Sequence, residues 1–355
     1  MNLSILKEVK VVTNNLGNHN NHNHNEDDFY QTSVYDAGCL NEIRISHLIK
    51  TEFFSDVPYP FYYVLEHAFI MLKDLNLNIV STPIQYVLLR YNWNISKYQP
   101  LSDYLTTVEY PYHFLSTMLD MYSQLVKNLL ELEKMNICFF GVSADNILID
   151  PNSHTGLSNF KNSLLDSDDM EEATRDFIRI VENTTCFTYK PIEIHVVHYL
   201  LKINGAPLSY SSIDEISTYF AENMEFLNHF DKEYKTKYYH ECVRHLKSMY
   251  LNKPKDHIIN EIRRETRKTW DNFALSILFL HIFENMIQVF SLNNTIINEL
   301  VFILKQNLNP IPNQRHTLSY TMDAINKLLL QTQDWSFLRL IPKSKMKKLY
   351  ERIVS

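Results

Sequence analysis

Helical patterns dominate the sequence from its middle to its end, whereas strand-like runs are concentrated in its first part. Between Phe114 and Leu129, apolar residues recur at three- and four-residue steps, which indicates a long amphipathic helix. The strand candidates are 7–12, 29–35 and 84–89, with one helical pattern at 40–50 among them. Because the two kinds of element are segregated along the chain, we predict an α+β fold, with a small mixed unit beside a large helical one. The later helical patterns are 212–229, 233–250, 256–268, 270–290, 295–306 and 317–331.

Length, charge and cysteine content restrict the class of protein. The chain has 355 residues, 45% of them hydrophobic, so it suits one large domain of two lobes or two smaller domains. A formal net charge of −7 without a long Lys/Arg run argues against nucleic acid and membrane partners. The four cysteines are widely spaced and form no C-x-x-C pair, as is typical of reduced thiols. Without a signal peptide or a membrane-spanning apolar run, we expect an intracellular protein.

Glycine is scarce, and this scarcity excludes one kind of phosphate site. The chain has only five glycines, and no two of them fit a G-x-G-x-x-G spacing. A G-x-x-x-x-G-K-[ST] loop is also absent from the sequence. Such glycines let backbone amides approach a phosphate closely. We therefore expect no phosphate site built from a glycine loop.

A tract of asparagine and histidine covers 18–25. It is too polar to pack into a core, so we predict a disordered loop. Its histidines, His19, His22 and His24, could hold a metal ion. The simpler interpretation is an insertion of biased composition, and we predict no metal site.

The segment 136–150 reads N-I-C-F-F-G-V-S-A-D-N-I-L-I-D and resembles the catalytic loop of protein kinases. That loop reads H-R-D-L-x-x-x-N, in which the Asp is the catalytic base and the Asn binds a metal ion. Asn146 stands at the Asn position, and a strand-like run follows it. Gly141 stands where the base belongs, and Phe139 and Phe140 replace the His-Arg pair. Since a glycine cannot accept a proton from a substrate hydroxyl, the resemblance implies a kinase fold without ordinary kinase chemistry.

Three further segments strengthen the resemblance because they occur in the kinase order and spacing. They are Asn41-Glu42-Ile43, 191–195 and 270–276, which are similar to the small-lobe helix, the end of the activation segment and the central helix of the large lobe. Their sequences are closest to those of divergent kinase-like proteins of large DNA viruses. The resemblance implies a bilobal protein-kinase-like fold, with a reduced N-lobe at 1–90 and a mainly helical C-lobe at 91–355.

In kinases an Asp-Phe-Gly motif follows the catalytic loop across a short hairpin, and its Asp holds the metal. The matching residues here are Asn159-Phe160-Lys161, with the hairpin turn at 151–155. A rival alignment places 154–158 at the motif, but it leaves too few residues for the two strands. Neither alignment has a carboxylate, and Asn159 offers a hard Mg²⁺ only a neutral amide.

The resemblance also implies residues with structural roles. Glu193 stands at the glutamate that ends the kinase activation segment. Arg315, within a run similar to the kinase Pro-x-x-Arg-x-Thr signature, stands at the arginine that pairs with it. We therefore expect a buried ion pair between them. Asp271 would anchor the backbone of the catalytic-loop segment from the central helix.

The residues that pair around the nucleotide in kinases are altered as well. Glu42 corresponds to the glutamate that pairs with a strand lysine. The best upstream strand, 29–35, contains no lysine, and Lys7 and Lys10 are the only lysines before Glu42. Either one of these reaches the site from a displaced strand, or the pair is lost.

An insert of helical character, at about 200–268, separates the activation-segment end from the central helix. Its charges are mixed in sign. Two interpretations stay open, a solvated helical appendage and a binding surface.

These residues favour a pseudokinase, a kinase-like protein that acts as a scaffold or allosteric partner of another protein. We expect no resident cofactor, although ATP and Mg²⁺ would be required if activity were retained. Nucleotide binding through backbone groups stays open at the predicted hinge strand, which contains Leu88, Leu89 and Arg90. If the viral resemblance holds, the protein is expected in host cytoplasm or in the virion.

Two alternatives stand beside this interpretation. The first is a divergent active Ser/Thr protein kinase that transfers phosphate from ATP, in which acids outside the kinase register supply the carboxylates. The second is a helical structural protein without kinase ancestry. In the active-kinase alternative, the acids that could supply the carboxylates are Asp145, Asp150, Asp166, Asp168 and Asp169.

Overall fold

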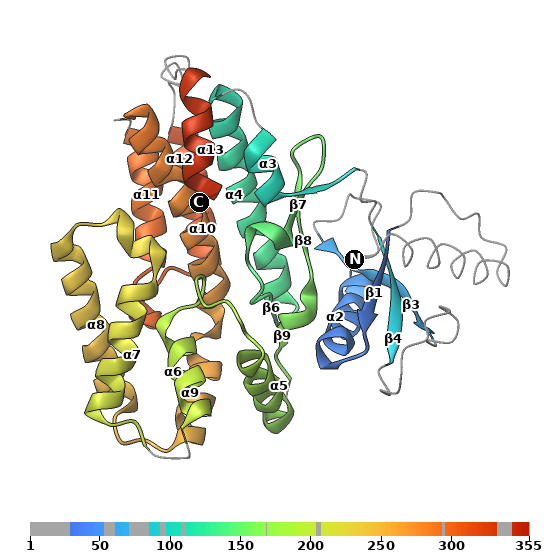
Figure 1. Cartoon of the computed structure of the whole chain (residues 1–355), viewed down its shortest axis with the longest axis vertical. Helices are drawn as coiled ribbons and strands as arrows, with labels where there is room; N and C mark the ends of the chain where they lie inside the picture. Colours follow the sequence, from blue (N-terminus) through green and yellow to red (C-terminus); the bar gives the residue numbers. More distant parts are fainter. Residues whose placement is uncertain are drawn as a thin grey trace.

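The computed structural model describes residues 29–52, 61–70, 85–92, 97–107, 111–167, 169–203, 207–292, 295–331 and 343–354. Over these ranges the protein is a mixed α+β structure in which helices predominate and the strands form small sheets, so the predicted class is confirmed. Figure 1 shows a small sheet with one helix on one side of a larger helical body. The predicted strand at 7–12, the tract at 18–25, Lys7 and Lys10 lie outside the described residues.

The small sheet contains three antiparallel strands in the order β1 (Tyr30–Val34), β4 (Tyr86–Tyr91) and β3 (Val64–Ile70). Helix α2 (Ala37–Glu52) packs against it, and the Ser46 hydroxyl accepts a hydrogen bond from the Val64 amide at 3.0 Å. Cys39 of α2 joins Val87 and Leu89 of β4 in a small buried cluster. The sheet and helix thus form one packed unit.

A second sheet connects this unit to the helical body. Its order is β2 (Phe61–Tyr62), β8 (Thr155–Ser158), β7 (Ile147–Ile149) and β5 (Gln99–Pro100), and β2 runs parallel to β8. The close approach of β2 to β8 depends on Gly156, because a Cβ added there would lie 2.2 Å from Cε2 of Tyr62. A short pair, β6 (Ile137–Cys138) with β9 (Leu164–Leu165), lies beyond the hairpin.

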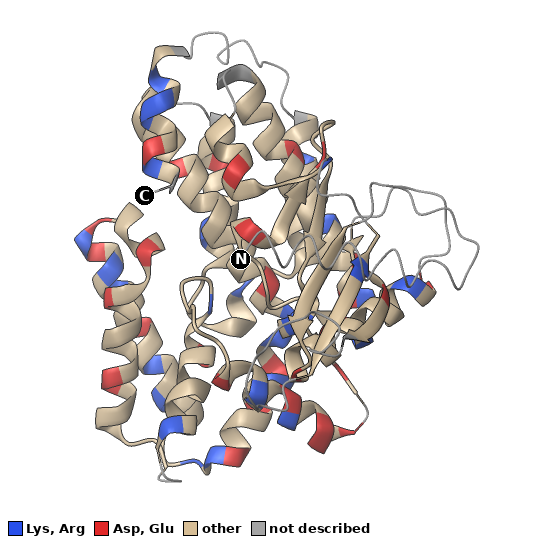
Figure 2. Ribbon diagram, turned by 45° about the vertical axis from the view of Figure 1, so that its right-hand side comes forward, with Lys and Arg blue, Asp and Glu red and all other residues tan. Residues whose placement is uncertain are grey.

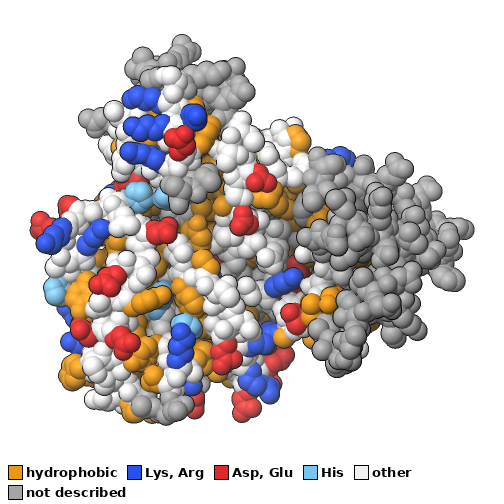
Figure 3. All heavy atoms as spheres, in the orientation of Figure 1, with side chains coloured by type: hydrophobic (Ala, Val, Ile, Leu, Met, Phe, Trp, Pro, Cys, Tyr) orange, Lys and Arg blue, Asp and Glu red, His pale blue; other side chains and the backbone are white. Residues whose placement is uncertain are grey.

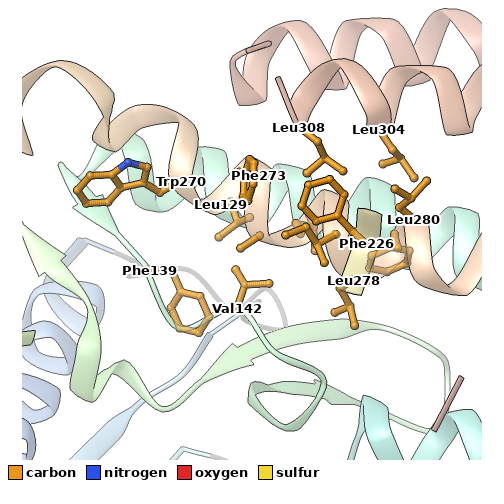
Figure 4. Close-up of a cluster of buried hydrophobic side chains, with 14 of the residues drawn as sticks. Leu129, Phe139, Val142, Phe226, Trp270, Phe273, Leu278, Leu280, Leu304 and Leu308 are labelled. Carbon is orange, nitrogen blue, oxygen red and sulfur yellow. The ribbon is translucent and has the colours of Figure 1, made fainter. Parts of the chain in front are cut away.

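The helical body surrounds α10 (Trp270–Phe290), whose sequence is apolar on all sides and whose residues are nearly all buried. Helix α4 (Pro111–Lys134) packs against α10, with the rings of Tyr122 and Phe279 centred 4.9 Å apart. Figure 4 shows Leu129 of α4 and Phe226 beside the side chains of α10. The remaining helices are α3 (Leu101–Thr107), α5 (Met170–Glu182), α6 (Ile192–Lys202), α7 (Tyr210–Asn223), α8 (Lys232–Tyr250), α9 (Lys255–Thr266), α11 (Thr295–Asn307), α12 (Leu318–Gln331) and α13 (Met346–Val354).

The predicted helices are found, and one of them is interrupted. The pattern at 212–229 breaks at Met224, where α7 ends and the 3-10 helix η4 (Glu225–His229) begins. Helices α5, α6 and α13 were not predicted. For α5 a signal was present, because Asp169 caps it by accepting from the amides of Glu171 and Glu172. Such a cap before a helix-spaced apolar face is a signal that sequence reading could have used.

One continuous helical stretch, Lys255–Phe290, is long and apolar enough to cross a membrane, but 78% of its apolar window is buried inside the protein. A core helix has this composition because it contacts other helices on every side. Figure 2 shows basic and acidic residues interspersed along the helices, and Figure 3 shows charged side chains of both signs scattered over one face of the molecule. On the face in Figure 3, basic side chains gather over the helix at the top, α13.

Candidate functional site

Helix α10 binds the backbone of the loop that resembles a catalytic loop. The Asp271 carboxylate accepts hydrogen bonds from the backbone amides of Phe139 and Phe140, each at 2.7 Å. Burial raises the pKa of Asp271, and the two amides and the Lys190 ammonium oppose that rise. The predicted contact between Asp271 and the loop backbone is confirmed.

Three residues that the resemblance assigns to kinase catalytic positions are linked to one another by hydrogen bonds. The Asn146 amide donates to the Gly141 carbonyl at 2.7 Å, and the Asn159 amide donates to Asn146 Oδ1 at 3.0 Å. Asn159 adopts left-handed backbone angles, φ 65° and ψ 71°, which asparagine tolerates better than most residues. The chain Gly141–Asn146–Asn159 therefore consists of neutral groups joined by two hydrogen bonds.

The hairpin decides between the two alignments of the Asp-Phe-Gly position. Residues 155–158 form β8 itself, paired with β7, and Asn159 follows at the strand end. The Ser158 hydroxyl donates to the Asn146 carbonyl at 3.2 Å, which brings the strand end to the loop. The alignment on Asn159-Phe160-Lys161 is the one that leaves both strands intact.

Carboxylates near the loop have structural partners. Asp145 accepts from the Ser102 hydroxyl at 2.7 Å, and Asp169 caps α5. Asp150 accepts from the amides of Asn152 and His154, and its pKa is lowered by these bonds and by the His154 side chain, which together outweigh burial. Asp166 pairs with Arg263 and Arg267, at 3.1 and 2.8 Å. Asp168 lies outside the described residues.

Helix α2 is fastened to the segment after β8. The Asn41 amide donates to the carbonyls of Phe160, Lys161 and Ser163, at 3.3, 3.0 and 2.8 Å. Next to it, Glu42 is buried and accepts from the Tyr91 hydroxyl at 3.1 Å. Burial raises the pKa of Glu42, although the Lys161 charge, the Tyr91 hydroxyl and the Phe160 amide oppose it.

Lys190 is a buried cation at this site that sequence reading missed. It lies just before α6, and its ammonium donates to the Phe140 carbonyl and lies 3.6 Å from the centroid of the Phe140 ring. Burial lowers its pKa to about 8, and the Asp271 charge opposes this. Lys190 thus binds the segment before α6 to the loop. Nothing in its local sequence distinguishes it from an exposed lysine.

The residues assigned to nucleotide binding on the hinge strand are placed differently from the prediction. Leu88, Leu89 and Arg90 lie in β4, which is the central strand and pairs with β1 on one side and β3 on the other. Leu88 and Leu89 are buried, and Arg90 pairs with Glu66 at 2.9 Å. Their backbone groups serve the sheet, so the assignment of adenine-binding groups to these residues is corrected.

The predicted ion pair between Glu193 and Arg315 is confirmed. The guanidinium donates to both carboxylate oxygens, at 2.6 and 2.9 Å, and both side chains are buried. Trp270 Nε1 donates to the same carboxylate at 3.0 Å. The pair joins α6 to the turn before α12, with the first residue of α10 between them.

The insert is built into the fold on its inner side. The rings of Phe220 in α7 and Tyr238 in α8 stack, and the Tyr238 hydroxyl donates to the Leu308 carbonyl at 2.8 Å. Cys242 of α8 is buried, and burial raises the pKa of its thiol. The charges of Arg315 and Glu193 also act on this pKa, so the thiol lies near the ion pair. The inner face of α8 therefore covers the ion pair, and a freely solvated appendage is excluded for this face. The outer stripe of α8 carries charges of both signs, among them Lys237 and Glu241.

Among the described residues, no group of three or more His, Cys, Asp or Glu side chains has the geometry of a metal site. No protein-family model matches this chain, and no curated protein sequence matches it significantly.

Proposed function

We propose that the protein is a pseudokinase: a bilobal kinase-like protein that lacks phosphoryl-transfer chemistry and acts as a scaffold or allosteric partner of another protein. The observation that carries the proposal is the neutral chain Gly141–Asn146–Asn159. Phosphoryl transfer needs a base near the acceptor hydroxyl and carboxylates that hold Mg²⁺. The positions that would supply them contain a glycine and an amide.

Support for the kinase-like part comes from two contacts that the resemblance predicted. Asp271 binds the loop backbone, and Glu193 binds Arg315. These contacts join residues up to 132 positions apart, so chance agreement of local patterns is a poor explanation. Architectural residues are retained where catalytic ones are replaced, which fits a protein selected for shape.

The rival hypothesis, an active Ser/Thr kinase with displaced carboxylates, is less well supported. Asp150, Asp166 and Asp169 are engaged in a turn, in two ion pairs and in a helix cap. Asp145 is the strongest rival because it adjoins Asn146, but Ser102 binds it. Each of these acids therefore already has a structural role in the fold.

The proposed lack of phosphoryl transfer is tested by measuring transfer of radiolabelled phosphate from ATP in Mg²⁺ and in Mn²⁺. Wild type and Asn146→Ala are compared. We expect equal labelling at background in both proteins. Labelling of the wild type that disappears in Asn146→Ala would support the active-kinase hypothesis instead. A thermal-shift measurement with ATP, with and without metal, shows separately whether a nucleotide binds.

The proposed role as a scaffold or allosteric partner has to be tested in cells. Where loss of the protein has a measurable phenotype, Asn146→Ala should restore function as well as wild type does, because Asn146 has no chemical role in a scaffold. Asn146 still donates to Gly141, so equal protein abundance must be verified first. Loss of function at equal abundance would contradict a purely structural role.

A further inference from the structure

The segment 343–355 is basic, although the chain as a whole is acidic. It contains five Lys or Arg residues and one acid, whereas the formal net charge of the chain is −7. Figure 3 shows basic side chains gathered over α13, which lies in this segment. Lys347, Lys348 and Arg352 of α13 are exposed, and Lys345, just before the helix, is partly exposed. These four residues are called the basic face of α13 below.

The apolar side of α13 is already used by the fold. Met346 and Leu349 are buried, and the rings of Tyr350 and Phe114 are centred 6.2 Å apart. Through this side the helix packs on α10 and α3. A helix that binds a membrane needs an exposed apolar face that enters the lipid. The side of α13 that is open to a partner is therefore its charged side.

The basic face is not neutralised within the part of the chain that the structure describes. Surface lysines elsewhere have an acid nearby; for example, Lys134 Nζ lies 2.7 Å from Glu131 Oε1. Among the described residues, no carboxylate oxygen lies within 4.0 Å of the ammonium groups of Lys345, Lys347 and Lys348. Their charges are therefore open to an external anion.

The placement of these charges does not favour the helix itself. Lys347 and Lys348 lie in the first turn of α13, which contains no acid, and cations in a first turn oppose the helix dipole. Lys348 and Arg352 are four residues apart, a spacing at which like charges destabilise a helix. A solvated face that served only the stability of α13 would have the opposite distribution of charge. The basic face therefore needs an explanation outside the helix.

We propose that the basic face of α13 is a docking surface for an acidic segment of a partner protein. Lys348 and Arg352 are about 6 Å apart along the helix axis, so carboxylates one turn apart on a partner helix would face both cations. Arg352 Nη1 donates to Gln288 Oε1 of α10 at 2.9 Å, which orients the guanidinium before a partner binds. The net negative charge of the chain repels nucleic acids and anionic membranes as whole surfaces, which leaves a short acidic segment as the complementary ligand. In naming the place where a partner binds, the proposal rests on the proposed scaffold function.

The test is binding of a fluorescein-labelled helical peptide with glutamates at i and i+4, measured by fluorescence anisotropy, with its glutamine counterpart as control peptide. We expect wild type to bind the glutamate peptide, more weakly as salt rises. Lys347→Glu/Lys348→Glu should weaken this binding at least about tenfold. Lys232→Glu/Arg244→Glu, on the outer stripe of α8, changes the net charge equally and should bind as wild type does.

Thermal unfolding of the same variants separates docking from folding. Because Lys347 and Lys348 oppose the helix dipole, Lys347→Glu/Lys348→Glu should have a Tm equal to or above that of wild type. A lower Tm would show that these lysines serve the fold and would overturn the proposal. Lys347→Gln/Lys348→Gln should also lose binding, and it covers the case that charge reversal prevents folding.

The binding data can overturn the proposal in four ways. The glutamate peptide fails to bind wild type, the glutamine peptide binds equally well, the α8 variant loses binding to the same extent, or phosphatidylserine vesicles bind wild type more tightly than the peptide does. The assay uses neither ATP nor the loop around Asn146. Failure here therefore leaves the proposed lack of phosphoryl transfer untouched, and phosphoryl transfer by the protein would leave this docking surface untouched.

Discussion

Arg315 reaches Glu193 across 122 sequence positions and binds its carboxylate through both terminal nitrogens. The guanidinium also lies over the Phe273 ring, 4.8 Å from its centroid, and its Nε donates to the Asn309 carbonyl at 2.7 Å. One buried cation thus joins α6, α10 and the turn before α12. Such a pair fixes the relative position of elements that no local interaction could align.

Arg315→Ala should destabilise the protein by about 3–5 kcal/mol, because it leaves the Glu193 carboxylate buried without a cation. Chemical denaturation of wild type and variant measures this directly. Arg264→Ala is the matched control, since Arg264 pairs with Glu265 on the surface and its loss should cost less than about 1 kcal/mol. Equal effects of the two substitutions would contradict the structural role of Arg315.

Gly156→Ala should destabilise the contact between β2 and β8 by about 1–3 kcal/mol, because the new methyl group overlaps the buried Tyr62 ring. Gly141→Ala is the control, because its nearest atom, Phe139 Cζ, would lie 3.5 Å from the added Cβ, an ordinary contact. The measurement is the urea midpoint of each variant. A Gly156→Ala protein as stable as Gly141→Ala would show that β2 does not pack on β8 as described.

His195 should make stability dependent on pH. Burial lowers its pKa to about 4, and Phe187 and Phe220 pack around its ring. A histidine with a depressed folded pKa stabilises the fold fully above its unfolded pKa of about 6.5, and that stability is lost as pH falls toward the folded pKa. The free energy of unfolding of wild type should fall between pH 6.5 and pH 4, and we expect His195→Phe to reduce this fall by about 2 kcal/mol. The exposed His240, replaced by Gln, should leave the profile of wild type unchanged; a similar change in both variants would refute the assignment.

Asn159→Asp should create a metal response that wild type lacks. The substitution puts a carboxylate beside Asn146, where the amide now donates at 3.0 Å, and hard divalent cations prefer charged oxygen ligands. We expect Mg²⁺ or Mn²⁺ at millimolar concentration to raise the Tm of this variant and to leave wild type unchanged. Asn162→Asp, in the same 3-10 helix, controls for the added charge. A metal response of wild type equal to that of Asn159→Asp would count against the reading of Asn159 as a degenerate metal position.

Local patterns in the sequence were sufficient for most elements and for several long-range contacts. Apolar spacing predicted α4 and α10, because a helix face that must be buried repeats at a fixed interval. The contacts of Asp271 and of Arg315 followed from motif positions rather than from periodicity. Motif order carries information on distant pairs, whereas composition and spacing do not.

The strand predicted at 84–89 is found as β4, but its place between β1 and β3 could not be predicted because sheet order is a tertiary property. The run from Ile84 to Leu89 was read as a strand, but nothing in it shows that two strands flank it and use its backbone groups. Helix α5 was overlooked for a different reason, since its short apolar face lies among acidic residues.

What the sequence determined by itself was the type of most elements and which residues stand at positions 141, 146 and 159, since both are properties of local residue order. Only the tertiary structure decided which side chains meet there. Nothing in the local sequence marks Lys190 as buried, and it is an interior group because the segment before α6 lies against the Phe140 loop. Burial of a charge depends on what surrounds it from distant parts of the chain, and no local pattern encodes that environment.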